Sequence, residues 1–290
     1  MLSYFRQWAK SKHRFALKLF AERPVSRLCS NPDVDLRLIG DSLQEASRGD
    51  LSSEEGIWID RIETLRKTLS ISRTEIDVVD FGAGEPNLVV SNEKMQSGRF
   101  VTRTVGSICR TASMPPLGSM VLFKLIRKFK PTNCVELGTS LGISAAYEAA
   151  ALAINHSGQL TTLEGSETLA ILAVKNHNYL GLTNVKVVIG RFQDTLPSVL
   201  EANKPVDYVF IDGHHDENAT VAYFETIKRY LAEKSLIIFD DISWSPGMKN
   251  AWKIIAADDQ ISISIDLKQI GVCIYNKRSS YKKTLKIPLI

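Results

Sequence analysis

The sequence has few of the features that mark specialised proteins. Its 290 residues include four cysteines, and none of them has the C-x-x-C spacing of a zinc or redox motif. No apolar run approaches the roughly 18–20 residues that a membrane-spanning helix needs. Near the start, Arg6 and Lys10 interrupt the apolar residues, which argues against a secretory pattern. We therefore expect a cytoplasmic protein with reduced, largely buried thiols and no membrane partner. The cysteines are Cys29, Cys109, Cys134 and Cys273.

A large excess of charge is also absent. The net charge is +4 and the isoelectric point is near 8.8. This modest excess does not favour nucleic acid as a partner, and no aromatic-rich RNA-binding module is present. Basic residues do gather near the start and after Tyr275, which keeps phosphate binding as an alternative. The amphipathic, basic segment Phe5–Phe20 also leaves open a protein that binds a membrane surface or a partner.

What the sequence does contain is an alternation of strand and helix patterns from Pro131 onward. Between the apolar runs lie segments with helical spacing, so the pattern predicts βαβ units in a parallel sheet that is covered on both faces. The five apolar runs are Cys134–Gly138, Leu160–Gly165, Val185–Gly190, Val206–Gly213 and Ser235–Asp241. The helical segments are Ser144–Ile154, Glu167–Leu180, Ala219–Leu231 and Gly247–Ala257.

The two ends of the chain differ from this alternation. Ile261–Leu267 and Gly271–Lys277 are joined by so few residues that only a hairpin can connect them. Residues 1–130 show apolar spacing typical of short amphipathic helices, and we expect a helical extension that forms a substrate lid or an oligomer contact. Residues 131–277 then form the catalytic domain, and residues 278–290 a basic tail. We also expect a homo-oligomer.

Two glycine-rich turns compete for the role of cofactor loop. In "CVELGTSLGISAAYEAAALA", a strand leads through Gly138 and Gly142 into an alanine-rich helix, and the next strand ends at Glu164. Glycines let the backbone approach a ligand, and an acid on the following strand can accept from ribose hydroxyls. The other turn, Val78–Asn87, contains Gly82 and Gly84 but lacks both the helix and the acid. We predict that it lines or covers the substrate pocket.

Two further groups of residues follow the later strands. Arg191, Phe192 and Gln193 come after the third run, where stacking and amide hydrogen bonds could enclose an adenine ring. Asp212 ends the fourth run, and Asp240 and Asp241 end the fifth. In a parallel sheet these ends open onto the same crevice. Three converging carboxylates call for a cation, and oxygen ligands suit Mg²⁺ best, with Mn²⁺ or Ca²⁺ as alternatives.

The stretch from Glu136 to Gly247 resembles the catechol-type O-methyltransferases. The motifs "VELGTSLGISA", "LTTLEG", "VVIGRFQDTLP", "VDYVFIDGHH" and "LIIFDDISWSPG" follow in that family's order. The double aspartate is also similar to metal-dependent O-methyltransferases that act on sugars of macrolide and aminocoumarin antibiotics. The resemblance implies a class I, Rossmann-like methyltransferase sheet of seven strands, five parallel and two in the C-terminal hairpin, with a helical N-terminal extension.

The resemblance also implies a transfer of a methyl group from S-adenosylmethionine to a hydroxyl of a small molecule, such as a phenol or a sugar. Asp212, Asp240 and Asp241 would bind the metal. His215 stands where the catechol enzymes have a lysine base, and His214 is a rival base. A nucleic-acid methyltransferase and a non-catalytic binding protein remain the alternatives. The expected cofactor-binding residues are Glu136, Gly138, Thr139, Ser140, Gly142, Ser144, Glu164, Gly165, Arg191, Phe192, Gln193 and Asp212.

Overall fold

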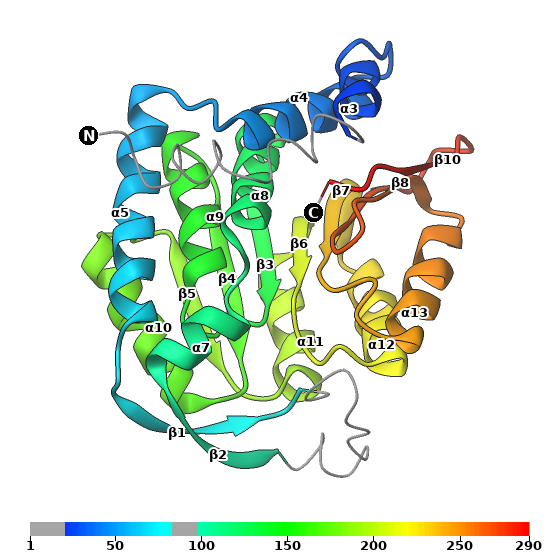
Figure 1. Cartoon of the computed structure of the whole chain (residues 1–290). Coiled ribbons are helices and arrows are strands. Elements are labelled where there is room, and N and C mark those ends of the chain that lie inside the picture. Colours follow the sequence, from blue (N-terminus) through cyan, green and yellow to red (C-terminus); the bar gives the residue numbers. More distant parts are fainter. Residues whose placement is uncertain (1–20, 83–97, 290) are drawn as a thin grey trace.

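The computed structural model describes residues 21–82 and 98–289 (Figure 1). One eight-stranded sheet dominates it, in the order β10-β8-β9-β7-β6-β3-β4-β5. Five strands run parallel: β3 (Asn133–Leu137), β4 (Gln159–Glu164), β5 (Val185–Ile189), β6 (Val206–Ile211) and β7 (Leu231–Phe239). The hairpin of β8 (Ile261–Asp266) and β9 (Gly271–Asn276) joins β7 in antiparallel fashion. The Rossmann-like sheet predicted from the sequence is confirmed.

Alternation of side chains along the strands builds a core on each face of the sheet. Cys134 and Tyr208 point into one apolar cluster, whereas Val135 and Val209 point into the other. The first cluster lies under α8 (Pro116–Phe129) and α9 (Ile143–Ile154), and α10 (Glu167–Leu180) completes that face. The second lies under α11 (Phe192–Asn203), α12 (Glu217–Lys228) and α13 (Pro246–Ala257). Both faces are therefore covered, as the apolar strands predict.

The N-terminal part packs against α8 and α9, and its buried apolar side chains belong to the first cluster. The helices are α3 (Glu22–Cys29), α4 (Val34–Arg48) and α5 (Ser53–Ser70), and α7 (Val105–Ala112) follows further on. A two-stranded sheet of β1 (Glu75–Asp80) and β2 (Arg99–Thr104) also belongs to this part, so it is not purely helical. Figure 1 shows this sheet beside the end of the molecule toward which β3 points. The basic segment Phe5–Phe20 lies outside the described residues.

The C-terminal residues differ from the expected tail. Lys283–Lys286 form β10, which pairs in parallel with β8 and extends the sheet to eight strands. The strand forms because Ile287 and Leu289 bury their side chains in the core on the α8 face. In this stretch, which resembles a basic tail in the sequence, less exposed residues (Lys283 and Leu285) thus alternate with exposed ones (Thr284 and Lys286), as in a half-buried edge strand.

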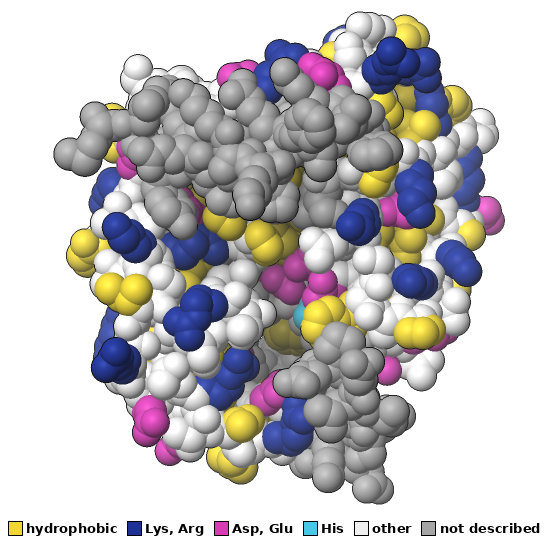
Figure 2. Space-filling model, in the orientation of Figure 1, with side chains coloured by type: hydrophobic (Ala, Val, Ile, Leu, Met, Phe, Trp, Pro, Cys, Tyr) yellow, Lys and Arg dark blue, Asp and Glu magenta, His cyan; other side chains and the backbone are white. Residues whose placement is uncertain are grey.

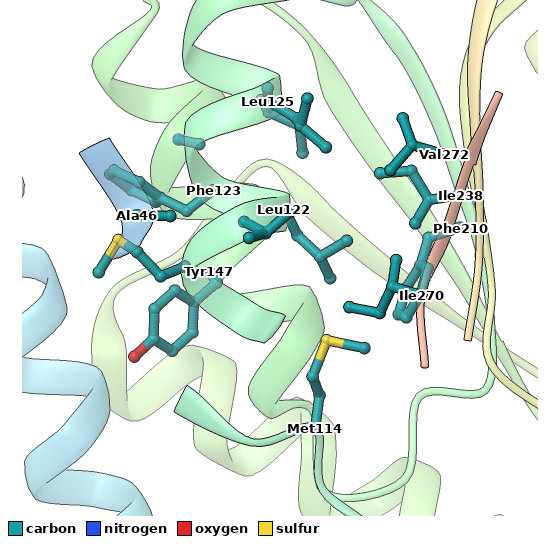
Figure 3. Packing of buried hydrophobic residues seen from close by; sticks show 14 of the residues in the cluster. Ala46, Met114, Leu122, Phe123, Leu125, Tyr147, Phe210, Ile238, Ile270 and Val272 are labelled. Carbon is teal, nitrogen blue, oxygen red and sulfur yellow. The ribbon is translucent and has the colours of Figure 1, made fainter. Parts of the chain in front are cut away.

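The core reaches the edge of the functional cavity. Figure 3 shows the close packing of buried residues from α8, α9 and the strands, with Met114 at one end of the cluster and Ile270 beside it. A Cβ atom added at Gly118 would approach Met114 to 2.9 Å and Ile270 to 3.3 Å. Met114 and Ile270 belong both to this core and to the wall of a large cavity. Of the described helices, none is both long and apolar enough to cross a bilayer.

Candidate functional site

A cavity of about 1000 Å³ opens at the carboxyl ends of the parallel strands. Leu137, Ile211 and Phe239 are in register across β3, β6 and β7, so the residues that follow them lie side by side. Backbone hydrogen bonds extend the sheet by one residue at this edge: Asp212 N donates to Leu137 O at 2.8 Å, and Asp240 N donates to Ile211 O at 2.9 Å. The sheet therefore fixes the aspartates beside the glycine turn, as expected for ligand sites in open α/β sheets.

The first glycine turn is held tightly against the ends of β6 and β4, the two strands that flank β3. Gly138 has φ of 107°, and a Cβ atom there would lie 1.8 Å from the carbonyl oxygen of Asp212. Ser140 N donates to Glu164 Oε2 at 2.7 Å, and Ser166 N donates to Glu164 Oε1 at 2.8 Å. Gly142 then caps α9 in a left-handed conformation. This geometry places Gly138, Ser140 and Glu164 on the cavity wall.

Glu164 is buried, and burial raises the pKa of its carboxyl. Its backbone donors oppose that shift, and the nearby charge of Asp80 adds to it. Two oxygens provide about four acceptor positions, and the two described backbone bonds leave room for further donors. Glu164 can therefore accept hydrogen bonds from a ligand in the cavity.

Four of the predicted cofactor residues do not line the cavity: Glu136, Thr139, Gly142 and Ser144. Glu136 is fully buried on the α9 side of the sheet, and burial raises the pKa of its carboxyl to about 7. Thr162 donates to Glu136 Oε2 at 2.5 Å, and the Thr139 hydroxyl lies 2.6 Å from that of Thr162. Glu136, Thr139 and Thr162 support the turn from beneath, and contact between the four residues and a cofactor stays a prediction.

The residues after β5 lie on the cavity wall at the start of α11. Arg191, Phe192 and Gln193 all line the cavity together with Gly165. Arg191 Nε donates to Asp194 Oδ2 at 2.6 Å. The Phe192 ring packs edge-on against Tyr223, with centroids 5.8 Å apart, and its edge lies directly over Gly213. An aromatic ring is therefore held in a fixed position where a flat group could contact it.

The three aspartates form an acidic end of the cavity. Figure 2 shows acidic side chains deep in the hollow of this face. Burial and the charges of Asp240 and Asp241 raise the pKa of Asp212 well above its ordinary value. Burial and Asp241 raise the pKa of Asp240 to about 7. Such mutual repulsion is the donor chemistry that a cation would relieve. The described side chains nevertheless include no group of three arranged as metal ligands.

The two histidines after β6 have different surroundings. His214 Nδ1 lies 3.0 Å from the Tyr223 hydroxyl, on α12. His215 instead lies between two aspartates, with Nε2 3.7 Å from Asp212 Oδ1 and Nδ1 3.8 Å from Asp241 Oδ2. Both histidines have positive φ, and their rings have different partners. Trp244 lies beside His215, with ring centroids 6.1 Å apart, and lines the cavity.

The described part of the second glycine turn, up to Gly82, meets this cavity from the N-terminal part, and the rest of the turn, with Gly84, lies outside the described residues. Asp80, Phe81 and Gly82 line the cavity, and a Cβ atom at Gly165 would lie 2.6 Å from the Phe81 ring. Val79 N donates to the Ser166 hydroxyl at 3.3 Å, so β1 is bonded to the loop that follows Glu164. The sequence singled out this turn as a possible pocket wall. It gave no signal for the arginines that line the same cavity from β2 and α7, namely Arg99, Arg103 and Arg110.

Comparison with known proteins agrees with this arrangement. Residues 135–242 match the family model described as "Methyltransferase domain". This segment is a methyltransferase domain. The match, with the strand order and the cavity at the strand ends, confirms the resemblance and the expectation of an enzyme. No curated protein sequence matches the chain significantly.

Solved structures share the fold of the methyltransferase domain at low sequence identity. A predicted caffeoyl-CoA O-methyltransferase from Staphylococcus aureus has a TM-score of 0.52 and 18% identity, covering 59% of this chain and 88% of its own. A methyltransferase of Podospora anserina, solved with bound S-adenosylhomocysteine, has a TM-score of 0.50 and 17% identity, covering 57% and 80%. An O-methyltransferase of Bacillus cereus has a TM-score of 0.49 and 24% identity, covering 57% and 84%.

Proposed function

We propose that the chain transfers a methyl group from S-adenosylmethionine to a hydroxyl of a small molecule, with the help of a divalent cation. One observation carries the proposal: a single cavity joins the Gly138 turn and Glu164 to the carboxylates of Asp212, Asp240 and Asp241. The first part suits a nucleoside with a charged tail, and the second suits a hydroxyl that must lose its proton. S-adenosylhomocysteine bound to the Podospora anserina structure supports the same ligand class here.

In this proposal the cofactor lies along the β3–β4–β5 edge of the cavity. Glu164 accepts from the ribose hydroxyls, because its remaining acceptor positions face the cavity that the Gly138 turn opens. Phe192 and Gln193 contact the adenine, and Arg191 borders it. Gly138 and Ser140 border the methionine part. Phe81 closes this region over Gly165.

The carboxylates of Asp212, Asp240 and Asp241 are the groups that would hold the cation, preferentially Mg²⁺. When bound, the cation would stabilise the deprotonated form of the acceptor hydroxyl. These side chains would orient that hydroxyl beside the end of the Gly138 turn. Trp244, Met114 and Ile270 give the adjoining wall an apolar surface that excludes water from the acceptor.

We assign the role of base to His215. Its ring lies among the aspartates, whereas His214 is engaged by Tyr223. The acceptor oxygen forms a bond to the methyl carbon as the carbon–sulfur bond breaks, the bond electrons stay on sulfur, and the hydroxyl proton passes to a ring nitrogen of His215. Alignment of the two reactants in such a displacement lowers the barrier by up to about 7–11 kcal/mol.

The test is methyl transfer from radiolabelled S-adenosylmethionine to a panel of phenols and sugars, with Mg²⁺ and with EDTA. Asp240→Asn keeps the shape of the side chain and removes its charge. We expect it, like EDTA, to lower turnover by at least about 100-fold, with the affinity for S-adenosylhomocysteine within about threefold of wild type. Asp259→Asn, on an exposed residue away from the cavity, is the matched control. Turnover that survives both treatments would exclude the cation.

A further inference from the structure

The wall of the cavity that faces β2 and α7 is basic, in contrast to its acidic end. Successive side chains of a strand alternate between its faces, and Arg99, Val101 and Arg103 share one face of β2. All three line the cavity. Arg110 on α7 lines it as well. Figure 2 shows the acidic side chains at the bottom of the hollow and Lys or Arg side chains on the surface around it.

The pairing of β1 with β2 determines which of these arginines already has an acidic partner. Arg99 lies opposite Asp80 in register, and the two side chains form an ion pair. Arg103 lies opposite Ile76, so the strand pair gives it no carboxylate. Its Nη2 donates to the Thr111 hydroxyl at 2.8 Å. Among the described residues, Arg103 therefore has a neutral partner and carries uncompensated charge.

Arg110, like Arg103, has no acidic partner among the described residues. Its Nη1 donates to the carbonyl oxygen of Ser70, and it forms no ion pair with any acid in the described part of the chain. A guanidinium has five N–H donors, so Arg103 and Arg110 each keep donors beyond the bond that anchors it. Within the described residues, Nε of Arg99 is also buried without a hydrogen-bond partner. Several charged donors thus border one cavity with no acceptor assigned to them.

We propose that Arg103 and Arg110 bind an anionic group of the methyl acceptor, a carboxylate or a phosphate ester. This inference rests on the proposed function and adds the charge of the substrate to it. Guanidinium groups hold both kinds of oxyanion by charge-assisted hydrogen bonds. The acceptor is then a hydroxyl compound with an anionic end: its hydroxyl faces the aspartates, its body packs on Ile108, Met114 and Trp244, and its anion meets the arginines.

The charge pattern also explains how two ligands of opposite charge share one cavity. S-adenosylmethionine carries a sulfonium and an ammonium group, which the acidic end attracts. An anionic acceptor is repelled from that end and attracted to the basic wall, so its orientation is set before the reacting atoms meet. Arg103 and Arg110 act here on affinity and orientation, and they take no part in the chemical step.

The test uses the full chain and small probes of defined charge, titrated by calorimetry with and without S-adenosylhomocysteine. Three catechols form a series: 3,4-dihydroxybenzoate is anionic, catechol neutral and dopamine cationic. Glucose 6-phosphate and glucose form a second pair that separates phosphate from carboxylate recognition. We expect one anionic probe to bind at least about tenfold more tightly than its neutral partner, the effect of one charge-assisted hydrogen bond.

The variants then assign the effect to the basic wall. Arg103→Gln with Arg110→Gln should weaken the anionic probe at least about tenfold and leave the neutral probe unchanged. The matching Lys variants, which keep the charge, should lose less. Arg229→Gln, on an exposed residue of the α12 C-terminus, is the control. The melting temperature and the affinity for S-adenosylhomocysteine report whether each variant is folded.

Two results would overturn the inference: anionic probes that bind no better than neutral ones, or a folded double Gln variant that binds them as wild type does. Failure of S-adenosylhomocysteine to bind the wild-type chain is a separate outcome. It would contradict the proposed function, while the probe titrations without that ligand would still show whether the basic wall binds anions.

Discussion

Among the described glycines, Gly138 is the one at which an added Cβ atom would meet the closest contact. Its φ of 107° is accessible to glycine and strained for other residues, and a Cβ atom would lie 1.8 Å from the Asp212 carbonyl oxygen. An alanine there must push β3 away from the strand that carries Asp212. Because the glycine turn and the aspartate share this contact, both halves of the proposed site depend on it.

We predict that Gly138→Ala lowers the free energy of unfolding by about 3 kcal/mol or more, combining backbone strain with a steric clash. The control is Gly56→Ala on α5, where nothing lies within 4 Å of the added Cβ atom. That change should raise the free energy of unfolding by about 0.5–1 kcal/mol, because glycine is a poor helix former. Urea denaturation of both variants measures the difference. Equal effects at the two sites would contradict the packing described for the turn.

At the residue scale, the sequence predicted where the acidic side chains of the cavity lie, but it did not predict how the residues around them are oriented. Asp212, Asp240 and Glu164 end strands of a parallel sheet, so their common edge followed from the pattern alone. Glu136 shares the motif with Gly138, yet it belongs to the strand itself and points beneath α9. The sequence favoured His215 as the base and kept His214 as a rival, because the surroundings of each ring depend on a loop with left-handed backbone angles that no local pattern reveals.

At the element scale, α4, α5 and α8 are joined by buried charges. Lys124 on α8 is 1% exposed, and its Nζ lies 2.9 Å from both Glu55 Oε2 and Glu45 Oε2. Arg127 Nε lies 3.0 Å from Glu55 Oε1. Burial alone would raise the pKa of Glu55, but the bonds to Lys124, Ser52 and Arg127 outweigh it and lower the pKa. Glu55 also completes the capping box of α5 with Ser52.

A lowered pKa in the folded state stabilises the protein above the unfolded pKa of about 4.3, and that stability is lost as the pH falls through the folded pKa. We predict that Glu55→Gln costs about 1–3 kcal/mol of unfolding free energy at pH 7 and that its difference from wild type shrinks at acid pH. Denaturant titrations at pH 7 and in the acid range measure this. Glu54→Gln, the exposed neighbour, is the control; a pH dependence shared by both variants would refute the assignment.

The elements themselves were predictable to different degrees. All five parallel strands and the hairpin follow from apolar runs and short links. The small sheet of β1 and β2 did not, because its strands are separated by a long stretch of chain and their pairing is non-local. The edge strand β10 could not be predicted for another reason. Its mixture of basic and apolar residues also suits a solvated tail, and only the burial of Ile287 distinguishes the two.

At the scale of the whole molecule, the cavity is built by two parts of the chain, the N-terminal part and the methyltransferase domain. The methyltransferase domain supplies the glycine turn, the aspartates and His215. The N-terminal part supplies Phe81 and the basic wall with Arg103 and Arg110. It is bonded to the domain through Val79 and Ser166. A sequence can reveal the residues of the methyltransferase domain through local motifs. The contribution of the N-terminal part depends on how β1, β2 and α7 dock against the domain, which only the folded chain shows.

The central claim is that the Gly138 turn and Glu164 hold S-adenosylmethionine beside the aspartates. The most direct test is calorimetric titration of the full chain with S-adenosylhomocysteine, comparing wild type, Glu164→Gln and the exposed control Glu225→Gln. We predict one saturable site in wild type and the control, and an affinity about 100-fold lower in Glu164→Gln, because two charge-assisted hydrogen bonds to the ribose are weakened. No saturable binding to wild type, or equal affinity in all three proteins, would contradict the account.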